Sequence, residues 1–156
     1  MTSQDDLIML ILSSPSGVGK TTISKKIQQK FQNFKISVSD TTRKPRENEV
    51  NGIDYFFISI EEFKKKIQNS GYYEHAKIFD NFYGTSKNEI EKNLKKNNNI
   101  LFDIDWQGTK QLSKFTKFRF LKIFILPPNK EELKKRLINR GPDNKKSIEK
   151  RLSSFE

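Results

Sequence analysis

The feature that most constrains this chain is a glycine-containing segment that joins a short apolar run to a stretch with helical periodicity. Residues 7–13 are apolar up to a final serine, a pattern typical of a strand buried on both faces of a parallel sheet. Residues 14–21 follow, and Ile23, Ile27 and Phe31 then repeat every four positions, which predicts a helix ending near Phe31. A buried strand, a turn with two glycines and a helix, in this order, predict a phosphate-binding loop.

The segment fits the phosphate-loop pattern Gly-x-x-x-x-Gly-Lys-Ser/Thr, except that a serine replaces the first glycine. The two glycines let backbone N–H groups approach phosphate oxygens. The lysine supplies positive charge to the terminal phosphates, and the threonine after it offers a hydroxyl to Mg²⁺. An ordinary strand–helix turn is the alternative interpretation. The predicted ATP- and phosphate-binding residues of this segment are Ser14, Pro15, Ser16, Gly17, Val18, Gly19, Lys20, Thr21 and Thr22.

Strand–helix alternation continues along the chain and predicts an α/β fold, with a parallel sheet covered by helices on both faces. Further strands of this sheet are expected at 35–39, 100–105 and 118–126. The middle of the chain differs, because it is rich in aromatic residues. We expect a strand at 53–58, a helix over 60–69 that Ser59 and Glu62 cap, and two strands within 72–83 that turn at Asp80 and Asn81. Residues 37–86 are therefore predicted to form a small α+β insertion, whose core includes the aromatic residues Phe56, Phe57, Phe63 and Phe79.

Composition excludes several classes of protein. The chain of 156 residues has no cysteine, so it has no disulfide framework and no thiolate metal site. No apolar run is long enough to cross a bilayer, and Asp5 and Asp6 stand where a secretory signal would be basic. The net charge of +11 comes from 24 lysines and only 6 arginines without a long basic block, which favours compositional bias over a nucleic-acid patch. We expect a cytoplasmic protein with neither nucleic acid nor membrane as its partner.

Two further sets of polar residues fit a nucleotide site. Asp103 and Asp105 end an apolar strand, and ligands of open α/β sheets bind beyond the carboxyl ends of the strands. Carboxylates placed there can hold Mg²⁺ directly or through water. Five of the six arginines fall in two short regions, and arginine is the residue suited to bidentate contact with phosphate. These five are Arg43, Arg46, Arg136, Arg140 and Arg151.

Together these segments resemble the guanylate kinases, enzymes that phosphorylate GMP from ATP. The matching segments are 13–22, 37–46, 49–56, 73–76, 83–85, 103–108 and 136–152, in the family's order and spacing. The run Ser-x-x-x-Arg-x-x-Arg at 39–46, with the later Asp-Tyr, Glu and Tyr-Gly elements, is specific to this family among phosphate-loop proteins. The resemblance implies a core domain of the P-loop NTPase type at 1–36 and 87–156, a GMP-binding insertion at 37–86 and a helical lid at about 136–152.

The resemblance also implies a role for each candidate residue. The lid arginines, Arg140 and Arg151, would swing over the transferring phosphate, and Arg136 would join the ATP-binding residues. Thr21 would bind Mg²⁺, with Asp103 as a further ligand, directly or through water. The catalytic set implied is Lys20, Arg43, Arg140 and Arg151. The GMP-binding set implied is Ser39, Arg43, Arg46, Tyr55 and Tyr83 for the phosphate, Glu74 and Thr85 for guanine with Glu49 nearby, and Asp103 and Asp105 close to GMP and the metal.

The chemistry of guanine agrees with this assignment. A carboxylate such as Glu74 can accept hydrogen bonds from N1–H and the 2-amino group of guanine, whereas adenine offers an acceptor at N1 and no 2-amino group. A site built in this way can reject the wrong base by ~10⁴-fold or more. The implied reaction is Mg²⁺-dependent and converts ATP and GMP to ADP and GDP. Lys20 and Thr21 favour an enzyme over a non-catalytic or crippled guanylate-kinase-like fragment. Glu74 and Thr85 favour it over a related kinase that acts on a ribose phosphate, and a nucleic-acid binder is the remaining alternative.

The chain departs from the family at two places: Ser14 replaces the first glycine of the loop, which is a modest change, and the C-terminal end differs more seriously. Members of the family continue beyond the position of Glu156 with more helix, another sheet strand and a final helix. We therefore expect a fragment or a truncated form, in which the sheet exposes an apolar face and an edge open to pairing. The oligomeric state is not readable from the sequence.

Overall fold

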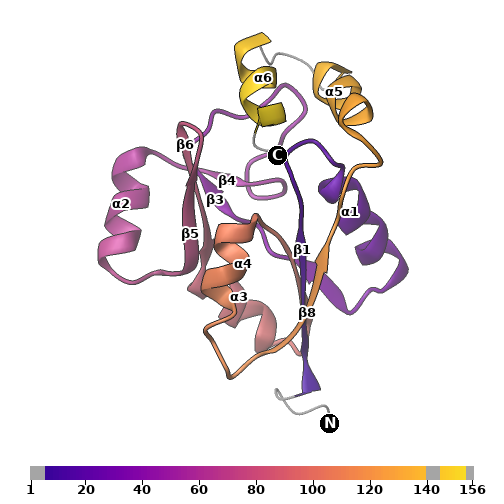
Figure 1. Cartoon of the computed structure of the whole chain (residues 1–156). Helices are drawn as coiled ribbons and strands as arrows, with labels where there is room; N and C mark the ends of the chain where they lie inside the picture. Colours follow the sequence, from indigo (N-terminus) through magenta and orange to yellow (C-terminus); the bar gives the residue numbers. More distant parts are fainter. Residues whose placement is uncertain (1–5, 140–144, 154–156) are drawn as a thin grey trace.

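The computed structural model of the chain describes residues 6–139 and 145–153, and its main sheet has four parallel strands (Figure 1). The strand order is β2-β7-β1-β8, so the first strand lies inside the sheet between two later ones. Every pairing in this sheet is parallel, which confirms the predicted α/β class. The strands are β1 (Ile8–Ser13), β2 (Phe34–Ile36), β7 (Asn99–Asp103) and β8 (Arg119–Phe124).

Helices cover both faces of this sheet, as predicted. On one face, Ile23 and Ile27 pack against Leu10 and Leu101, so the four-residue apolar period is the buried side of the first helix. On the other face, helix residues such as Ile90 pack against the opposite side chains of β1 and β7. The helices involved are α1 (Lys20–Lys30) on the first face, and α3 (Lys87–Leu94) and α4 (Trp106–Leu112) on the second.

The residues between β2 and α3 form a second, mixed sheet beside one helix. Its strand order is β4-β3-β6-β5, in which β3 and β4 are parallel and the other pairs are antiparallel. Phe63, on the helix, is fully buried, whereas Phe56, Phe57 and Phe79 are only half-buried. The predicted aromatic core is therefore centred on the Phe63 ring. The elements are β3 (Asp40–Thr41), β4 (Phe56–Phe57), α2 (Ile60–Gln68), β5 (Tyr72–Ile78) and β6 (Asn81–Ser86).

Two local predictions for this part of the chain were wrong in detail. The strand expected at 53–58 shrinks to two residues, because the backbone of Ile53 and Asp54 donates to Val50 and forms a turn instead. The hairpin turns at Phe79 and Asp80, one residue earlier than expected, since β6 already begins at Asn81.

Two helices, α5 (Lys130–Asn139) and α6 (Lys145–Ser153), stand at the top of the molecule in Figure 1, above the loop that follows β1. Leu133 and Leu137 of α5 are fully buried against Val18 of that loop, and Ile148 and Leu152 of α6 pack against the same cluster. Asn129 caps α5, since its Oδ1 accepts from the Glu132 N–H at 2.8 Å. This apolar cluster holds both helices on the phosphate loop.

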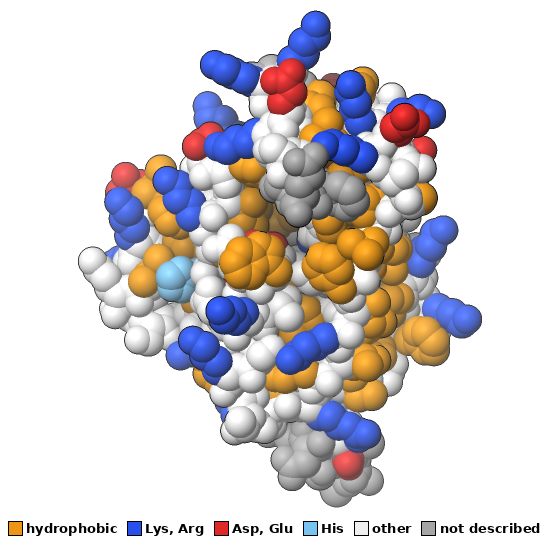
Figure 2. Space-filling view, in the orientation of Figure 1, with side chains coloured by type: hydrophobic (Ala, Val, Ile, Leu, Met, Phe, Trp, Pro, Cys, Tyr) orange, Lys and Arg blue, Asp and Glu red, His pale blue; other side chains and the backbone are white. Residues whose placement is uncertain are grey.

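The strand β8 forms one edge of the main sheet and is largely exposed. The exposed apolar side chains on and after it are Leu121, Ile123, Phe124 and Leu126, and Trp106 of α4 is 64% exposed nearby. Figure 2 shows hydrophobic side chains gathered on the right of this view, while Lys and Arg are spread over the face without a single block. The predicted exposed apolar edge is therefore present in the described part of the chain.

The capping box of α2 yields a test of local stability. Ser59 Oγ accepts from the Glu62 N–H at 3.1 Å, and the Glu62 carboxylate accepts from the Ser59 N–H at 2.9 Å. Ser59→Ala should lower the free energy of unfolding by about 1 kcal/mol in urea titrations. Ser86→Ala is the control, because Ser86 stands at the N-cap of α3 without a capping side-chain hydrogen bond, and it should change stability by less than about 0.5 kcal/mol. Equal losses in both variants would contradict the role of the box.

Candidate active site

The loop after β1 has a backbone that only glycines can supply. Gly17 and Gly19 have φ of 90° and 100°, a left-handed conformation that side chains rarely adopt. A Cβ on Gly17 would lie 2.6 Å from Cδ2 of Leu137, so this glycine also makes room for α5. Gly19 caps α1 without a side chain, which leaves the first N–H groups of the helix able to bind an anion.

Asp103 joins the phosphate loop to the end of β7. The parallel pairing sets Leu12 of β1 opposite Asp103, so the carboxylate emerges beside the loop. Its Oδ1 lies 3.2 Å from Lys20 Nζ, and its Oδ2 accepts from Thr21 Oγ1 at 3.0 Å. Lys20 Nζ also donates to the carbonyl of Ile104 at 3.4 Å. The lysine, the threonine hydroxyl and one carboxylate therefore share a single position at the carboxyl edge of the sheet.

Glu74 is a carboxylate buried in the opposite wall. It lies on β5 directly across from Thr85 on β6, and its side chain accepts from Thr85 Oγ1 at 2.5 Å. Glu74 is 4% exposed and Thr85 is fully buried. Burial raises the pKa of Glu74 to about 7, because the Thr85 hydrogen bonds that lower it are outweighed by desolvation, to which the charge of Asp105 adds.

The first turn of α4 provides the floor beneath this carboxylate. Asp105 caps the helix, since its side chain accepts from the Gly108 N–H at 3.0 Å. A Cβ on Gly108 would lie only 2.4 Å from Oε2 of Glu74. Gly108 stands at the end of a matching sequence segment, but no role is predicted for it from sequence, because its importance comes from a carboxylate on a distant strand. The Glu74 carboxylate can occupy this position only because Gly108 has no side chain.

Arg43 is held by a bidentate ion pair with Glu49. Its two terminal nitrogens lie 2.9 and 2.8 Å from the Glu49 oxygens, and Arg46 reaches the same carboxylate at 3.6 Å. Burial acts to raise the pKa of Glu49, but the hydrogen bonds and charges of Arg43 and Arg46 outweigh it and bring the pKa below its usual value. Burial also disfavours the charge on Arg43, yet the hydrogen bonds and charge of Glu49 and the nearby Tyr83 leave its pKa raised. Arg43 is thus held in place as a cation before any ligand binds.

Aromatic residues surround this arginine. The Arg43 guanidinium lies 5.4 Å from the ring centre of Tyr55, and the Tyr55 and Tyr83 rings meet edge to face at 5.9 Å. Ser39, the residue before β3, is 8% exposed. These residues come from the loop before β3, the turn before β4 and strand β6, and only the fold brings them together.

The two described lid arginines contact the phosphate loop. Arg136 of α5 donates from Nη1 to the carbonyl of Val18 at 3.0 Å. Arg151 of α6 donates from Nη1 to Ser16 Oγ at 2.6 Å. Arg140, the third arginine of the predicted lid, lies outside the described residues.

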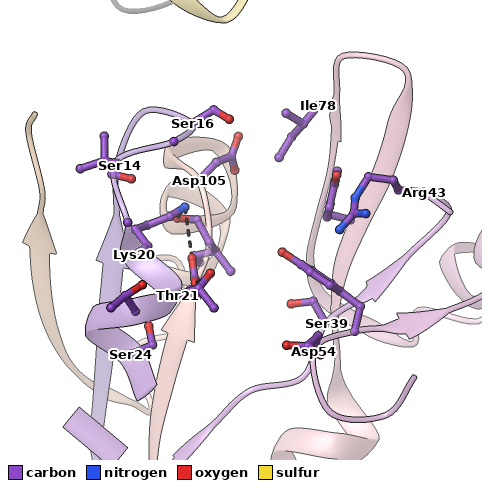
Figure 3. A pocket seen from close by; sticks show the side chains of 18 of the residues that line it. Ser14, Ser16, Lys20, Thr21, Ser24, Ser39, Arg43, Asp54, Ile78 and Asp105 are labelled. Carbon is purple, nitrogen blue, oxygen red and sulfur yellow. Dashed lines mark hydrogen bonds and ion pairs between the residues drawn. The ribbon is translucent and has the colours of Figure 1, made fainter. Parts of the chain in front are cut away.

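Most of these groups line one cleft of about 580 Å³ between the two sheets. Figure 3 shows Lys20 and Thr21 on one wall and Ser39 and Arg43 on the other, with open space between them. Of the predicted site residues that the structure describes, only Thr85 is absent from the cleft surface, because it lies behind Glu74. The lining residues that sequence reasoning missed are Ser24, Lys25, Ile36, Ser37, Ile53, Asp54, Ala76, Ile78, Phe79 and Ile104.

The oxygen atoms beside the loop fit Mg²⁺ that binds together with a nucleotide, rather than a metal ion whose ligands all come from the protein. Thr21 and Asp103 offer hard oxygen atoms next to the loop, which suits an ion that keeps several waters and binds mainly through substrate phosphates. Among residues 6–139 and 145–153 there is no group of three or more His, Cys, Asp or Glu that could hold a metal ion.

Comparisons with known proteins agree with this geometry. A sequence model of the guanylate kinase family matches residues 7–156. The guanylate kinases of Rickettsia bellii and Wolbachia pipientis wMel are each 46% identical over all 156 residues, which cover 81% and 78% of those proteins. The crystal structure of guanylate kinase from Anaplasma phagocytophilum superposes with a TM-score of 0.73 at 37% identity, over 94% of this chain and 71% of that one.

A parallel sheet with a phosphate loop, facing a second sheet across a polar cleft, defines a P-loop nucleotide kinase. Within that class, the chain belongs to the guanylate kinase family. In the described part of the chain, no helix is both long and apolar enough to span a membrane.

The raised pKa of Glu74 can be measured without any ligand. In carbon-13 NMR titrations of the side-chain carboxyl groups, Glu74 should titrate near pH 7, well above an ordinary glutamate. Thr85→Val should raise this pKa further, because it removes the hydroxyl hydrogen bond that stabilises the ionised form. Asp105→Asn should lower it, because it removes a neighbouring negative charge while keeping a helix-capping side chain. A Glu74 that titrates near its usual value in the unmodified chain would contradict the burial argument.

Proposed function

We propose that this chain transfers the γ-phosphoryl group of ATP to the phosphate of GMP, giving ADP and GDP. The observation that carries the proposal is the pairing, across one cleft, of a phosphate loop with a buried carboxylate held by a threonine. Family membership supports the same reaction. The wall with Lys20 would take the phosphates of ATP, and the wall with Glu74 would take GMP.

Glu74 would read the guanine base. In its ionised form it has two acceptor oxygens, which match the N1–H and 2-amino donors on one edge of guanine. Thr85 already donates to one of these oxygens and would keep the carboxylate in this orientation. Adenine would bring a lone pair at N1 toward a negative, buried group, so AMP should be a poor acceptor.

Arg43 and Arg46 would bind the GMP phosphate together with the hydroxyl groups of Tyr55 and Tyr83. We assign Glu49 to positioning these arginines rather than to reading guanine, because its two oxygens are already engaged by Arg43. A guanidinium whose orientation is set in advance loses less freedom when phosphate binds, which favours affinity.

The transfer step requires in-line placement of the two substrates and positive charge beside the transferring phosphoryl group. An oxygen of the GMP phosphate would attack the γ-phosphorus of ATP in line with the departing ADP oxygen, which keeps the electron pair of the broken bond. A phosphate monoester has its second pKa near 6, so at neutral pH the attacking group is already ionised and no base has to remove a proton. Lys20 and Arg151 would stabilise the charge on the transferring group, and Arg136 would hold the phosphate loop against α5.

Mg²⁺ would be held by Thr21 and, directly or through water, by Asp103, together with the ATP phosphates. It supplies positive charge to the phosphate oxygens and orients them. The present contacts of Asp103 with Lys20 and Thr21 show that all three side chains reach one point.

The direct test measures ADP formation by the 156-residue chain with Mg²⁺ and ATP, comparing GMP, AMP, CMP and UMP as acceptors. We expect turnover with GMP alone, and a loss of at least ~10²-fold in kcat for Lys20→Ala. Lys26→Ala is the matched control, since Lys26 lies on the same helix, is exposed and does not line the cleft. GMP binding without turnover would instead support a nucleotide-binding fragment, and the absence of both would overturn the site assignments.

Gly108→Ala should separate the acceptor site from the donor site. Alanine is favoured over glycine in a helix, so α4 itself should not be weakened. The added Cβ would displace the Glu74 carboxylate, and the KM for GMP should rise at least ~10-fold while the KM for ATP changes less than ~2-fold. Lys110→Ala, an exposed change on the same helix, should leave both values unaltered. A Gly108→Ala variant with unchanged KM for GMP would argue against Glu74 as the guanine reader.

A further inference from the structure

The ring of Phe79 lies against the helix that carries Arg151. Phe79 is at the tip of the β5–β6 hairpin, and in Figure 1 this tip rises toward α6. The Arg151 guanidinium is 5.4 Å from the centre of the Phe79 ring, and Lys150 Nζ is 5.2 Å from it. Two consecutive cations of α6 therefore contact one aromatic ring that belongs to the second sheet.

Arg151 also reaches the phosphate loop, so it connects three separate parts of the fold. Its Nη1 donates to Ser16 Oγ at 2.6 Å, while its guanidinium lies near the Phe79 ring. Phe79, Ser16 and Arg151 all line the same cleft. A ring beside the guanidinium restricts where this long, flexible side chain can lie, and the attraction between cation and ring holds it there.

The backbone at Phe79 supplies an independent reason to look for a role. Phe79 has φ of 54°, a left-handed conformation that is strained for a bulky residue. Two-residue hairpin connections usually place Gly, Asn or Asp at such a position. Strain of this kind persists where the rest of the structure requires the side chain, and it gathers at functional sites.

We propose that Phe79 is a positioning residue, whose ring holds α6 and the Arg151 guanidinium against the phosphate loop. The proposal rests on the proposed function for its effect on catalysis, though not for the contact itself. Because Glu74 and Thr85 lie on the same two strands as the tip, the hairpin that reads the base also touches the lid. Binding of GMP at the hairpin should therefore favour the lid arrangement that holds Arg151 in place.

Three substitutions at Phe79 test this role through kinetics. Phe79→Leu keeps apolar bulk but loses the aromatic face, and kcat should fall about 10-fold with the KM for GMP changed less than ~3-fold. Phe79→Tyr keeps the face and should retain kcat within about 2-fold. Phe79→Asn suits the positive φ and should keep or raise the melting temperature while kcat still falls. Loss of kcat without loss of stability is a result that a merely structural role would not produce.

Phe31→Leu is the matched control. Phe31 ends α1, is 48% exposed and carries Lys30 at 5.7 Å from its ring centre, so it is another aromatic–cation pair, and it does not line the cleft. This variant should leave kcat unchanged.

Backbone hydrogen exchange separates the contact from the activity. In the ligand-free chain, Phe79→Leu should speed exchange of the amides in 145–153 by about 10-fold and leave α2 unaffected. Faster exchange in α6 together with a lower kcat would support the proposal. Unchanged exchange in α6, or faster exchange with unchanged kcat, would overturn it. If the unmodified chain showed no turnover, the proposed function would fail in that arm, while the exchange result would still decide whether Phe79 holds the helix.

Discussion

The parallel pairing of β1 with β7 is the constraint on which the site depends. Because Leu12 lies opposite Asp103, the phosphate loop at the end of one strand and the carboxylate at the end of the other meet at the same edge of the sheet. The ion pair between Lys20 and Asp103 follows from this register. A shift of the pairing by one residue would turn Asp103 to the other face of the sheet and separate the two groups.

A second requirement is a cleft wall that can hold an acidic side chain away from water. The inserted sheet meets this requirement by placing Glu74 opposite Thr85 and above Gly108, where one hydroxyl donates to it and no side chain competes for its space. Burial without a cationic partner is unfavourable for the ionised form, and the pKa of Glu74 near 7 reflects that. A ligand that brings hydrogen-bond donors would offset the unfavourable burial of the ionised carboxylate, which is how guanine would be selected.

Features encoded over a few neighbouring residues could be predicted from the sequence. The strand–loop–helix unit around Lys20 and the capping box of Ser59 and Glu62 are of this kind, because their partners lie within one helical turn or one short loop. Features that depend on distant neighbours could not. The two-residue strand β3 exists only through its pairing with β4 and β6, and the role of Gly108 depends on a carboxylate 34 positions away. The ion pair of Glu49 with Arg43 needs the folded loop, and the positive φ of Phe79 runs against the preference of such turns for Gly, Asn or Asp.

The central claim is that an ionised, buried Glu74 receives the guanine of GMP, and calorimetry of GMP binding tests it most directly. With a pKa near 7, Glu74 is about half protonated at pH 7, so binding that requires the ionised form should release about 0.5 proton. Titrations in two buffers of different ionisation enthalpy measure this release. We expect it to disappear at pH 9 and to fall to about 0.1 proton in Glu74→Gln, where only the GMP phosphate still loses a proton. The affinity of the unmodified chain should fall more steeply than that of Glu74→Gln as the pH drops below 7. Tight GMP binding at pH 7 without proton release, or with the same release in Glu74→Gln, would contradict the account.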